Sequence, residues 1–283
     1  MKLVTFSHRD GSGSGHAGVL EGDSVICLTK AGLASDVMSI IRDPASLVRI
    51  KAGLAKAPRY ALGDVKLEAP IHPGKVLCSG INYRGHAEEN PNAKMPTEPF
   101  FFAKLPSSVV GPNEPVEKPV RTEQMDYEVE FAAVIGGALH KASEAAIMPA
   151  IFGYTLLNDI SARDVQFKDN QITIGKNFAG FAPIGPCILT ADAMPRPDNV
   201  ALKTRLNGRL LQDGSTSDWL FSLPQLISFL SQYVPLEPGD IVTTGTPAGV
   251  GIFRKPPVFM KAGDVVEIEA EGIGILRTPI RAA

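Results

Sequence analysis

The stretch Asp126-Tyr-Glu-Val-Glu-Phe-Ala-Ala-Val-Ile-Gly136 places two glutamates directly before an apolar run that ends at a glycine. The apolar run predicts a buried strand. Because residues i and i+2 of a strand share a face, Glu128 and Glu130 should project side by side. Two adjacent carboxylates repel each other, and burial increases this cost unless a cation compensates. We therefore predict a divalent metal here, although most Glu-x-Glu pairs lie on a solvated strand face.

A second run, Gly153-Tyr-Thr-Leu-Leu-Asn-Asp-Ile-Ser-Ala-Arg-Asp164, predicts a strand that ends in polar residues. Asp159 at its end is either a third oxygen ligand or a helix or turn cap. A ligand set made only of carboxylates favours Mg²⁺ or Mn²⁺, with Ca²⁺ as a further candidate, because hard cations prefer oxygen. Lys176, which follows Gly175, is either a surface lysine or a cation that balances the carboxylates and holds an oxo acid.

Two further runs carry polar residues that could take part in chemistry. In Cys78-Ser-Gly-Ile-Asn-Tyr-Arg-Gly-His-Ala-Glu-Glu-Asn90, His86 and Glu89 lie three residues apart. On a helix they would share a face and could form a base and its orienting partner, although a solvated helix start explains them equally well. In Gly239-Asp-Ile-Val-Thr-Thr-Gly-Thr-Pro-Ala-Gly-Val-Gly251, a predicted strand opens into a loop that could present N–H groups and a hydroxyl to a carboxylate.

From residue 75 onward, strand-like runs separated by turn signals dominate the sequence. The predicted strands include 76–79, 129–135, 200–206, 240–244 and 265–270. One helix is well defined, because the apolar residues 223, 226, 227 and 230 follow the i, i+3, i+4, i+7 pattern. Ser222 and Gln225 can form its capping box. The pattern predicts an α+β, strand-rich fold.

The first 70 residues differ in pattern from the rest. Short strands at 2–7, 18–20 and 24–28 precede helical pieces at 37–41 and 45–55. The prolines and glycine of Ala69-Pro-Ile-His-Pro-Gly74 interrupt regular pairing. We predict a small α+β domain over 1–70 and a catalytic domain over 71–283.

Composition restricts the partners and the compartment. The 28 Lys+Arg against 30 Asp+Glu give a net charge of −2, which gives no reason to expect nucleic acid or an anionic membrane as partner. No apolar run approaches the roughly 18 residues of a membrane span. The three widely spaced cysteines, Cys27, Cys78 and Cys187, predict buried thiols in a reducing cytoplasm.

In this order, the four runs resemble the fumarylacetoacetate hydrolase family, which includes acylpyruvate hydrolases, oxaloacetate decarboxylases and related oxo-acid hydratases and isomerases. The resemblance covers about residues 70 to 280. It rests on Asn82-Tyr83 with His86-Ala-Glu-Glu89, Asp126-Tyr-Glu-Val-Glu130, Asn158-Asp159 with Ser161-Ala-Arg-Asp164, Gly175-Lys176, and Thr244-Gly-Thr-Pro247.

The resemblance implies the family's mixed β-roll fold, a homodimer, and a small-molecule oxo-acid substrate. Its implied Mg²⁺ or Mn²⁺ ligands are Glu128, Glu130 and Asp159. The implied catalytic residues are His86, Glu89 and Lys176, with His86 and Glu89 on a segment that orders over bound substrate. The implied substrate-binding residues are Asn82, Tyr83, Arg163, Gln166 and Thr246.

One segment departs from the family pattern. Where many members read Gly-Lys-Ser-Phe-Asp-Thr-Phe, this chain reads Gly175-Lys-Asn-Phe-Ala-Gly-Phe181. Asn177 replaces a hydroxyl, and Ala179 with Gly180 removes an acid and another hydroxyl. We expect the pocket wall beside Lys176 to differ in polarity, which leaves the substrate's identity open.

The residues support one leading hypothesis and three alternatives. The leading hypothesis is hydrolysis of a C–C bond in a 2,4-dioxo acid, in which His86 and Glu89 activate water and the cation and Lys176 stabilise the enolate that leaves. Decarboxylation of an oxaloacetate-like acid would need the same enolate stabilisation but no water. Hydration or isomerisation of an unsaturated oxo acid is also compatible. An alternative of another class is a catalytically silent member that binds metal and small acids.

Overall fold

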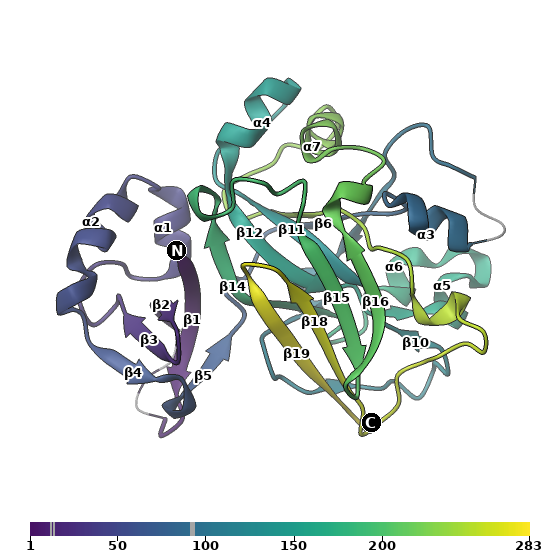
Figure 1. Ribbon diagram of the computed structural model, residues 1–283, viewed down its shortest axis with the longest axis horizontal. Coiled ribbons are helices and arrows are strands. Elements are labelled where there is room, and N and C mark those ends of the chain that lie inside the picture. The colour runs from purple at the N-terminus through teal and green to yellow at the C-terminus, as the bar shows by residue number, and fades with distance from the viewer. Residues whose placement is uncertain (12, 14, 91–93) are drawn as a thin grey trace.

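A computed structural model describes residues 1–11, 13, 15–90 and 94–283, and it confirms the strand-rich α+β fold (Figure 1). The main sheet contains β4 (Arg59–Ala61), β3 (Ser24–Cys27), β2 (His16–Glu21), β1 (Lys2–His8), β14 (Ala182–Thr190), β12 (Ile151–Asn158), β11 (Val129–Ile135), β17 (Ile241–Thr243), β6 (Val76–Ser79) and β7 (Phe101–Lys104), in that spatial order. Two further strands join it at the side, β5 (Val65–Glu68) against β1 and β8 (Val109–Val110) against β14.

Two smaller sheets complete the strand framework. The first, in spatial order, contains β16 (Arg209–Ser215), β15 (Ala201–Leu206), β18 (Val265–Ala270), β19 (Gly274–Arg281) and β9 (Val116–Glu117). The second pairs β10 (Met125–Asp126) with β13 (Ser161–Ala162). The helices are α1 (Val37–Arg42), α2 (Ser46–Gly53), α3 (Arg84–Glu89), α4 (Glu144–Ala150), α5 (Arg163–Gln166), α6 (Ile172–Gly175) and α7 (Leu223–Ser231).

Strand β11 is the centre of the fold, and all seven of its residues are buried. It lies between β12 and β17 in the main sheet. Phe131 packs in one apolar cluster with residues of the five-stranded sheet such as Ile268, whereas Val134 packs in a second cluster that includes Ile40 of α1. Since both faces of β11 are covered, its residues from Phe131 to Ile135 are all apolar rather than alternating with polar ones.

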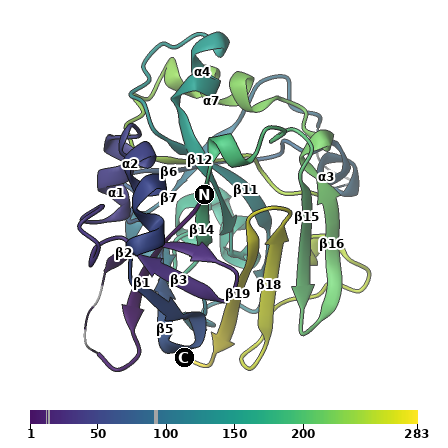
Figure 2. The same cartoon turned by 60° about the vertical axis from the view of Figure 1, so that its left-hand side comes forward.

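The N-terminal segment joins the main sheet. Strand β1 pairs with β14 antiparallel, with Lys2 opposite Leu189 and Leu3 opposite Ile188. Figure 1 shows this segment, in purple and blue, on the side of β14 away from β12, and Figure 2 shows the five-stranded sheet as a separate layer. The segment therefore shares hydrogen bonds and core with the rest of the chain, and the boundary at residue 70 stays a prediction.

Several local predictions are confirmed. Strands β11 and β18 have the expected bounds, and α7 begins at a capping box in which Ser222 and Gln225 bond each other's backbone N–H. The three cysteines are buried and free, as expected. Among the described residues, none of the helices has the length and apolar character needed to cross a membrane.

Candidate active site

The predicted carboxylate triad forms where β11 and β12 lie side by side. Val129 pairs with Asn158, which places Glu128 next to Asp159. Two hydrogen bonds fix this arrangement: the Asp159 N–H donates to the Glu128 carbonyl (3.0 Å), and the Glu128 N–H donates to Asn158 Oδ1 (3.1 Å). Carboxylate oxygens of Glu128, Glu130 and Asp159 all lie within 4.8 Å of one another, and all three residues are buried. The strand pairing therefore brings together the three predicted ligands.

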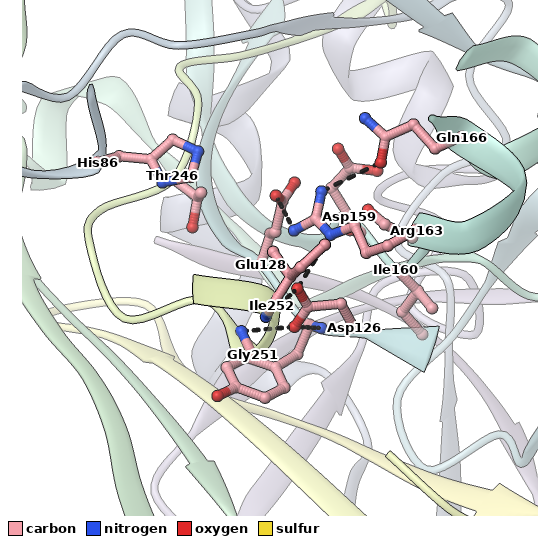
Figure 3. A network of polar contacts seen from close by, with 12 residues as sticks. His86, Asp126, Glu128, Asp159, Ile160, Arg163, Gln166, Thr246, Gly251 and Ile252 are labelled. Atoms are coloured by element: carbon pink, nitrogen blue, oxygen red, sulfur yellow. Dashed lines mark hydrogen bonds and ion pairs between the residues drawn. The ribbon is translucent and has the colours of Figure 1, made fainter. Parts of the chain in front are cut away.

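Two predicted cations contact the triad. The Lys176 ammonium donates to Glu128 Oε2 (2.9 Å) and to Asp159 Oδ2 (2.5 Å). Arg163 donates from Nη2 to Glu128 Oε1 (2.5 Å) and from Nη1 to Gln166 Oε1 (3.2 Å), as Figure 3 shows. Burial opposes ionisation of Glu128, but Arg163 and Lys176 outweigh it and hold the pKa of this carboxyl below its usual value.

Two charged residues that sequence reasoning did not assign complete the cluster. Lys104, fully buried at the end of β7, donates to Asp159 Oδ1 (2.5 Å) and to the Ile160 carbonyl (3.1 Å). Asp126 accepts from Arg163 Nε (2.9 Å) and from the backbone N–H groups of Gly251 (2.7 Å) and Ile252 (3.1 Å) (Figure 3). Asp126 therefore orients the guanidinium and ties it to the segment that follows β17.

A cavity of about 210 Å³ opens over this cluster. Seven of the predicted site residues line it: His86, Glu128, Glu130, Arg163, Gln166, Lys176 and Thr246. In Figure 3, His86 and Thr246 lie on one side of Glu128, and Arg163 and Gln166 lie on the other. The cavity therefore brings the carboxylates, the cations and a histidine to one site.

His86 and Glu89 form the expected pair on α3. The ring Nδ1 lies 2.6 Å from Glu89 Oε1, and Glu89 Oε2 accepts from the Gly249 N–H (2.7 Å). Because an ionised carboxylate only accepts hydrogen bonds, Nδ1 carries the hydrogen, and Nε2 of the neutral ring is the basic nitrogen. Glu89 therefore fixes the tautomer of His86 and joins α3 to the loop after β17.

The other predicted substrate contacts differ in position. The Thr246 hydroxyl accepts from Gln212 Nε2 (2.8 Å), which fixes it at the cavity. Asn82 does not line the cavity: its amide group donates to the Thr244 carbonyl (3.0 Å) and accepts from the Phe221 N–H (2.9 Å). Tyr83 is fully buried in the core, and burial raises the pKa of its phenol. Both residues hold in place the segment that directly precedes α3 in the sequence. Their contact with substrate stays a prediction.

Comparison with known proteins agrees with this arrangement. The family model described as "Fumarylacetoacetate (FAA) hydrolase C-terminal" matches residues 75–281. The chain belongs to the fumarylacetoacetate hydrolase family. It is 39% identical to the fumarylacetoacetate hydrolase domain-containing protein 2 homolog of Dictyostelium discoideum, over 98% of this chain and 96% of that protein. It is 43% identical to the mitochondrial oxaloacetate tautomerase fahd2 of Xenopus laevis, over 77% of this chain and 69% of that protein.

Two solved structures of this family share the whole fold. A fumarylacetoacetate hydrolase from Exiguobacterium antarcticum has a TM-score of 0.87 and 35% identity, with 100% of each chain covered. A maleylpyruvate hydrolase from Sphingobium has a TM-score of 0.84 and 30% identity, with the same coverage. The family thus includes hydrolases and isomerases of oxo acids, and this chain belongs to a family of enzymes.

The departure from the fumarylacetoacetate hydrolase pattern has a structural role. Asn177 accepts from the Leu105 N–H through Oδ1 (2.5 Å) and donates from Nδ2 to the Ala103 carbonyl (3.1 Å). Asn177 therefore ties the end of α6 to β7 on both sides of Lys104, and it does not line the cavity. Gly180 has a φ of 81°, and a Cβ there would meet Val116 at 3.2 Å. The change of polarity expected in this segment therefore affects the residues that support Lys104 and Lys176 more than it affects the cavity wall.

The donor set fits the divalent cation that this family uses. The cluster contains four carboxylates, from Asp126, Glu128, Glu130 and Asp159, and three cationic side chains, from Lys104, Arg163 and Lys176. One negative charge is left uncompensated, and Glu130 Oε2 is buried with no hydrogen-bond partner among the described residues. Burial, then Asp159 and Glu128, raises the pKa of Glu130 well above its usual value. Oxygen donors with an uncompensated charge suit Mg²⁺ or Mn²⁺.

Replacing Lys104 by methionine tests the buried ion pair. Asp159 Oδ1 would lose its partner in a fully buried site, so we expect the metal-free protein to lose about 3 kcal/mol of unfolding free energy. Added Mg²⁺ should recover part of the loss, because it would compensate the carboxylate. Urea unfolding with EDTA and with Mg²⁺ measures both effects. The control is Lys51→Met, which breaks an exposed pair with Asp192 and should cost under about 1 kcal/mol. Equal losses in the two variants would contradict this account.

Proposed function

We propose that the protein is a divalent-cation-dependent tautomerase of a 2-oxo acid such as oxaloacetate, which moves a proton between C3 and the 2-oxo oxygen. The observation that carries this proposal is that His86, Glu128 and Glu130 line one cavity. Glu89 is bonded to His86 behind this lining, and Asp159 completes the triad with the two glutamates. Several relatives are oxaloacetate tautomerases, among them the Xenopus laevis protein, which supports oxaloacetate as the reference substrate.

The triad would hold the cation, and the lysine beside it would hold the substrate. When bound, the cation supplies positive charge that stabilises negative charge developing on the 2-oxo oxygen. Lys176 has three N–H donors, of which two are directed at Glu128 and Asp159. The third is available to an anionic oxygen of the substrate. Lys176 therefore orients the substrate and adds to the stabilisation of the enolate.

His86 would carry the proton. Nε2 takes a proton from C3 of the oxo form, the electron pair of the C–H bond forms the enolate, and the same nitrogen returns the proton to the oxygen. Glu89 stabilises the imidazolium that exists between the two transfers, since its carboxylate bonds Nδ1–H at 2.6 Å. The ring is neutral again after each cycle, so no other reactant is consumed.

A second candidate function is hydrolysis of a C–C bond in a 2,4-dioxo acid. The same nitrogen could take a proton from water in place of C3, and the hydroxide would then attack the remote carbonyl. The structural similarity to the maleylpyruvate hydrolase favours this candidate. Both reactions pass through an enolate of the 2-oxo acid, so the site accounts equally for their shared step.

Spectrophotometry of the purified protein tests the proposal. With Mg²⁺ or Mn²⁺, the enol form of oxaloacetate should lose its absorbance faster than in the same buffer and metal without protein. With EDTA the enzymatic rate should fall about a hundredfold or more, because charge stabilisation by a metal contributes several kcal/mol. Acylpyruvates assayed in parallel would reveal hydrolysis. A rate unchanged by EDTA would refute the metal-dependent mechanism.

A further inference from the structure

Along one face of β7, the residues that border the cavity change from charged at its base to apolar at its mouth. Alternate residues of a strand share a face, so Phe100, Phe102 and Lys104 lie along one side of this strand and the chain just before it. Lys104 is fully buried against Asp159 at the base of the site. Phe102 lines the cavity, with the Lys176 ammonium 4.8 Å from its ring centroid. Phe100 also lines the cavity and is half exposed, which places it at the mouth.

A second aromatic side chain lies beside the candidate base. The ring centroid of Phe253 is 6.1 Å from that of His86, and both residues line the cavity. Gly80 makes room for the Phe100 ring, since a Cβ on Gly80 would meet that ring at 2.6 Å. Phe167 and two isoleucines, Ile81 and Ile172, add further apolar surface to the lining. The lining beyond the carboxylates is therefore mostly apolar, and its uncharged polar side chains come from Ser79, Asn90, Gln166 and Thr246.

Charge in the lining is confined to the metal site and the base. Among the described residues that line the cavity, the cationic side chains are Arg163 and Lys176, apart from His86. Arg163 is bonded to Asp126 and Glu128, and Lys176 is bonded to Glu128 and Asp159. With a divalent cation added, the cluster would carry one net positive charge, which matches a single substrate carboxylate. A second carboxylate on the substrate would meet aromatic rings instead of a cation.

We infer that the preferred substrate is a 2-oxo monocarboxylic acid with an uncharged, apolar tail that lies against Phe100, Phe102 and Phe253. Oxaloacetate, the reference substrate of the proposed function, shares the oxo-acid end but carries a second carboxylate, so it should be a poorer substrate than such an acid. This inference rests on the proposed function for the oxo-acid end of the substrate, and it adds the chemical character of the substrate's other end. Apolar tail atoms gain by leaving water, whereas a remote carboxylate would lose hydration without a partner.

Calorimetry with substituted oxamates tests whether an apolar tail on the ligand strengthens binding. Oxamate presents a carboxylate beside a carbonyl, as a 2-oxo acid does, and it has no C3–H to lose, so binding is measured without turnover. Into the Mg²⁺-loaded protein we would titrate oxamate, N-propyloxamate, N-benzyloxamate and N-(carboxymethyl)oxamate. Affinity should rise by about fourfold for each methylene of the tail that is buried. The carboxymethyl compound should bind no more tightly than oxamate.

A variant at the cavity mouth locates the effect. Phe100→Ala should lower the affinity for N-benzyloxamate several-fold more than the affinity for oxamate, because the ring of Phe100 contacts only the tail in this proposal. Tyr233→Ala, at an exposed aromatic residue outside the cavity, is the control and should change neither value. Tails that give no gain, a carboxymethyl compound that binds most tightly, or no oxamate binding at all would overturn the inference. The proposed function fails separately, if neither oxaloacetate nor a 2-oxo monocarboxylic acid with an apolar tail shows a metal-dependent rate of enol decay.

Discussion

Replacing Glu130 by glutamine is expected to abolish activity and to weaken Mg²⁺ or Mn²⁺ binding by at least about a hundredfold. Even partners outside the ligand set change metal affinity by about 10–100-fold, so loss of a charged ligand should have a larger effect. Glu130 Oε2 is buried, and no described side chain or backbone group bonds it, which makes it an available ligand. Calorimetric titration of the metal measures the affinity.

The same substitution should stabilise the metal-free protein. Glu130 is buried beside Asp159 and Glu128, and burial raises its pKa. The folded chain therefore retains a proton that the unfolded chain releases, and stability falls as the pH rises from the usual glutamate pKa through the folded-state value. Glutamine has no such cost, so in EDTA the melting temperature of Glu130→Gln should exceed that of the unmodified protein, with a difference that grows with pH.

Asp159→Asn is the matched control, and its effect on stability should have the opposite sign. It also removes one ligand charge, but it leaves Lys104 and Lys176 facing a neutral amide in a buried site. We expect weaker metal binding together with a lower melting temperature in EDTA. If both variants lowered the melting temperature equally, the uncompensated charge would not lie on Glu130.

Local periodicity was sufficient to predict the strand at the centre of the fold and the proximity of the carboxylates beside it. The i, i+2 relation placed Glu128 and Glu130 together, and the end of the next strand supplied Asp159 because β11 and β12 pair there. The pairing of β1 with β14 joins residues more than 180 positions apart. No local pattern specifies such a contact, so the continuity of the N-terminal segment with the main sheet could not be read from the sequence.

The supporting residues of the site escaped prediction for a similar reason. Lys104 follows Phe-Phe-Ala, and nothing in these letters indicates that its ammonium reaches Asp159, 55 residues further along the chain. Asp126 stood within the motif that predicted the metal site, but its partner N–H groups belong to Gly251 and Ile252. Asn177 was expected to alter the cavity wall, and the structure assigns its amide to the backbone of β7. Such roles depend on tertiary contacts rather than on residue spacing.

Replacing His86 by glutamine is expected to lower kcat for tautomerisation by about 10²–10⁴-fold, the usual contribution of a positioned general base. Glutamine keeps a polar side chain of similar length but cannot take the proton from C3. Metal affinity and oxamate affinity should change little, because the triad and Lys176 do not depend on the ring for their hydrogen bonds. Stopped-flow measurement of enol decay gives kcat, and calorimetry gives the two affinities.

Decarboxylation separates the role of the base from that of the metal site. Loss of CO₂ from oxaloacetate needs enolate stabilisation but no base, so any decarboxylation that the protein performs should survive His86→Gln. Glu89→Gln should reduce tautomerisation less than His86→Gln and shift its pH profile, since the amide cannot stabilise the imidazolium as a carboxylate does. If His86→Gln kept full tautomerase activity, the proton would be carried by another group at the cavity. The pair on α3 would then serve only to hold that helix against the loop at Gly249.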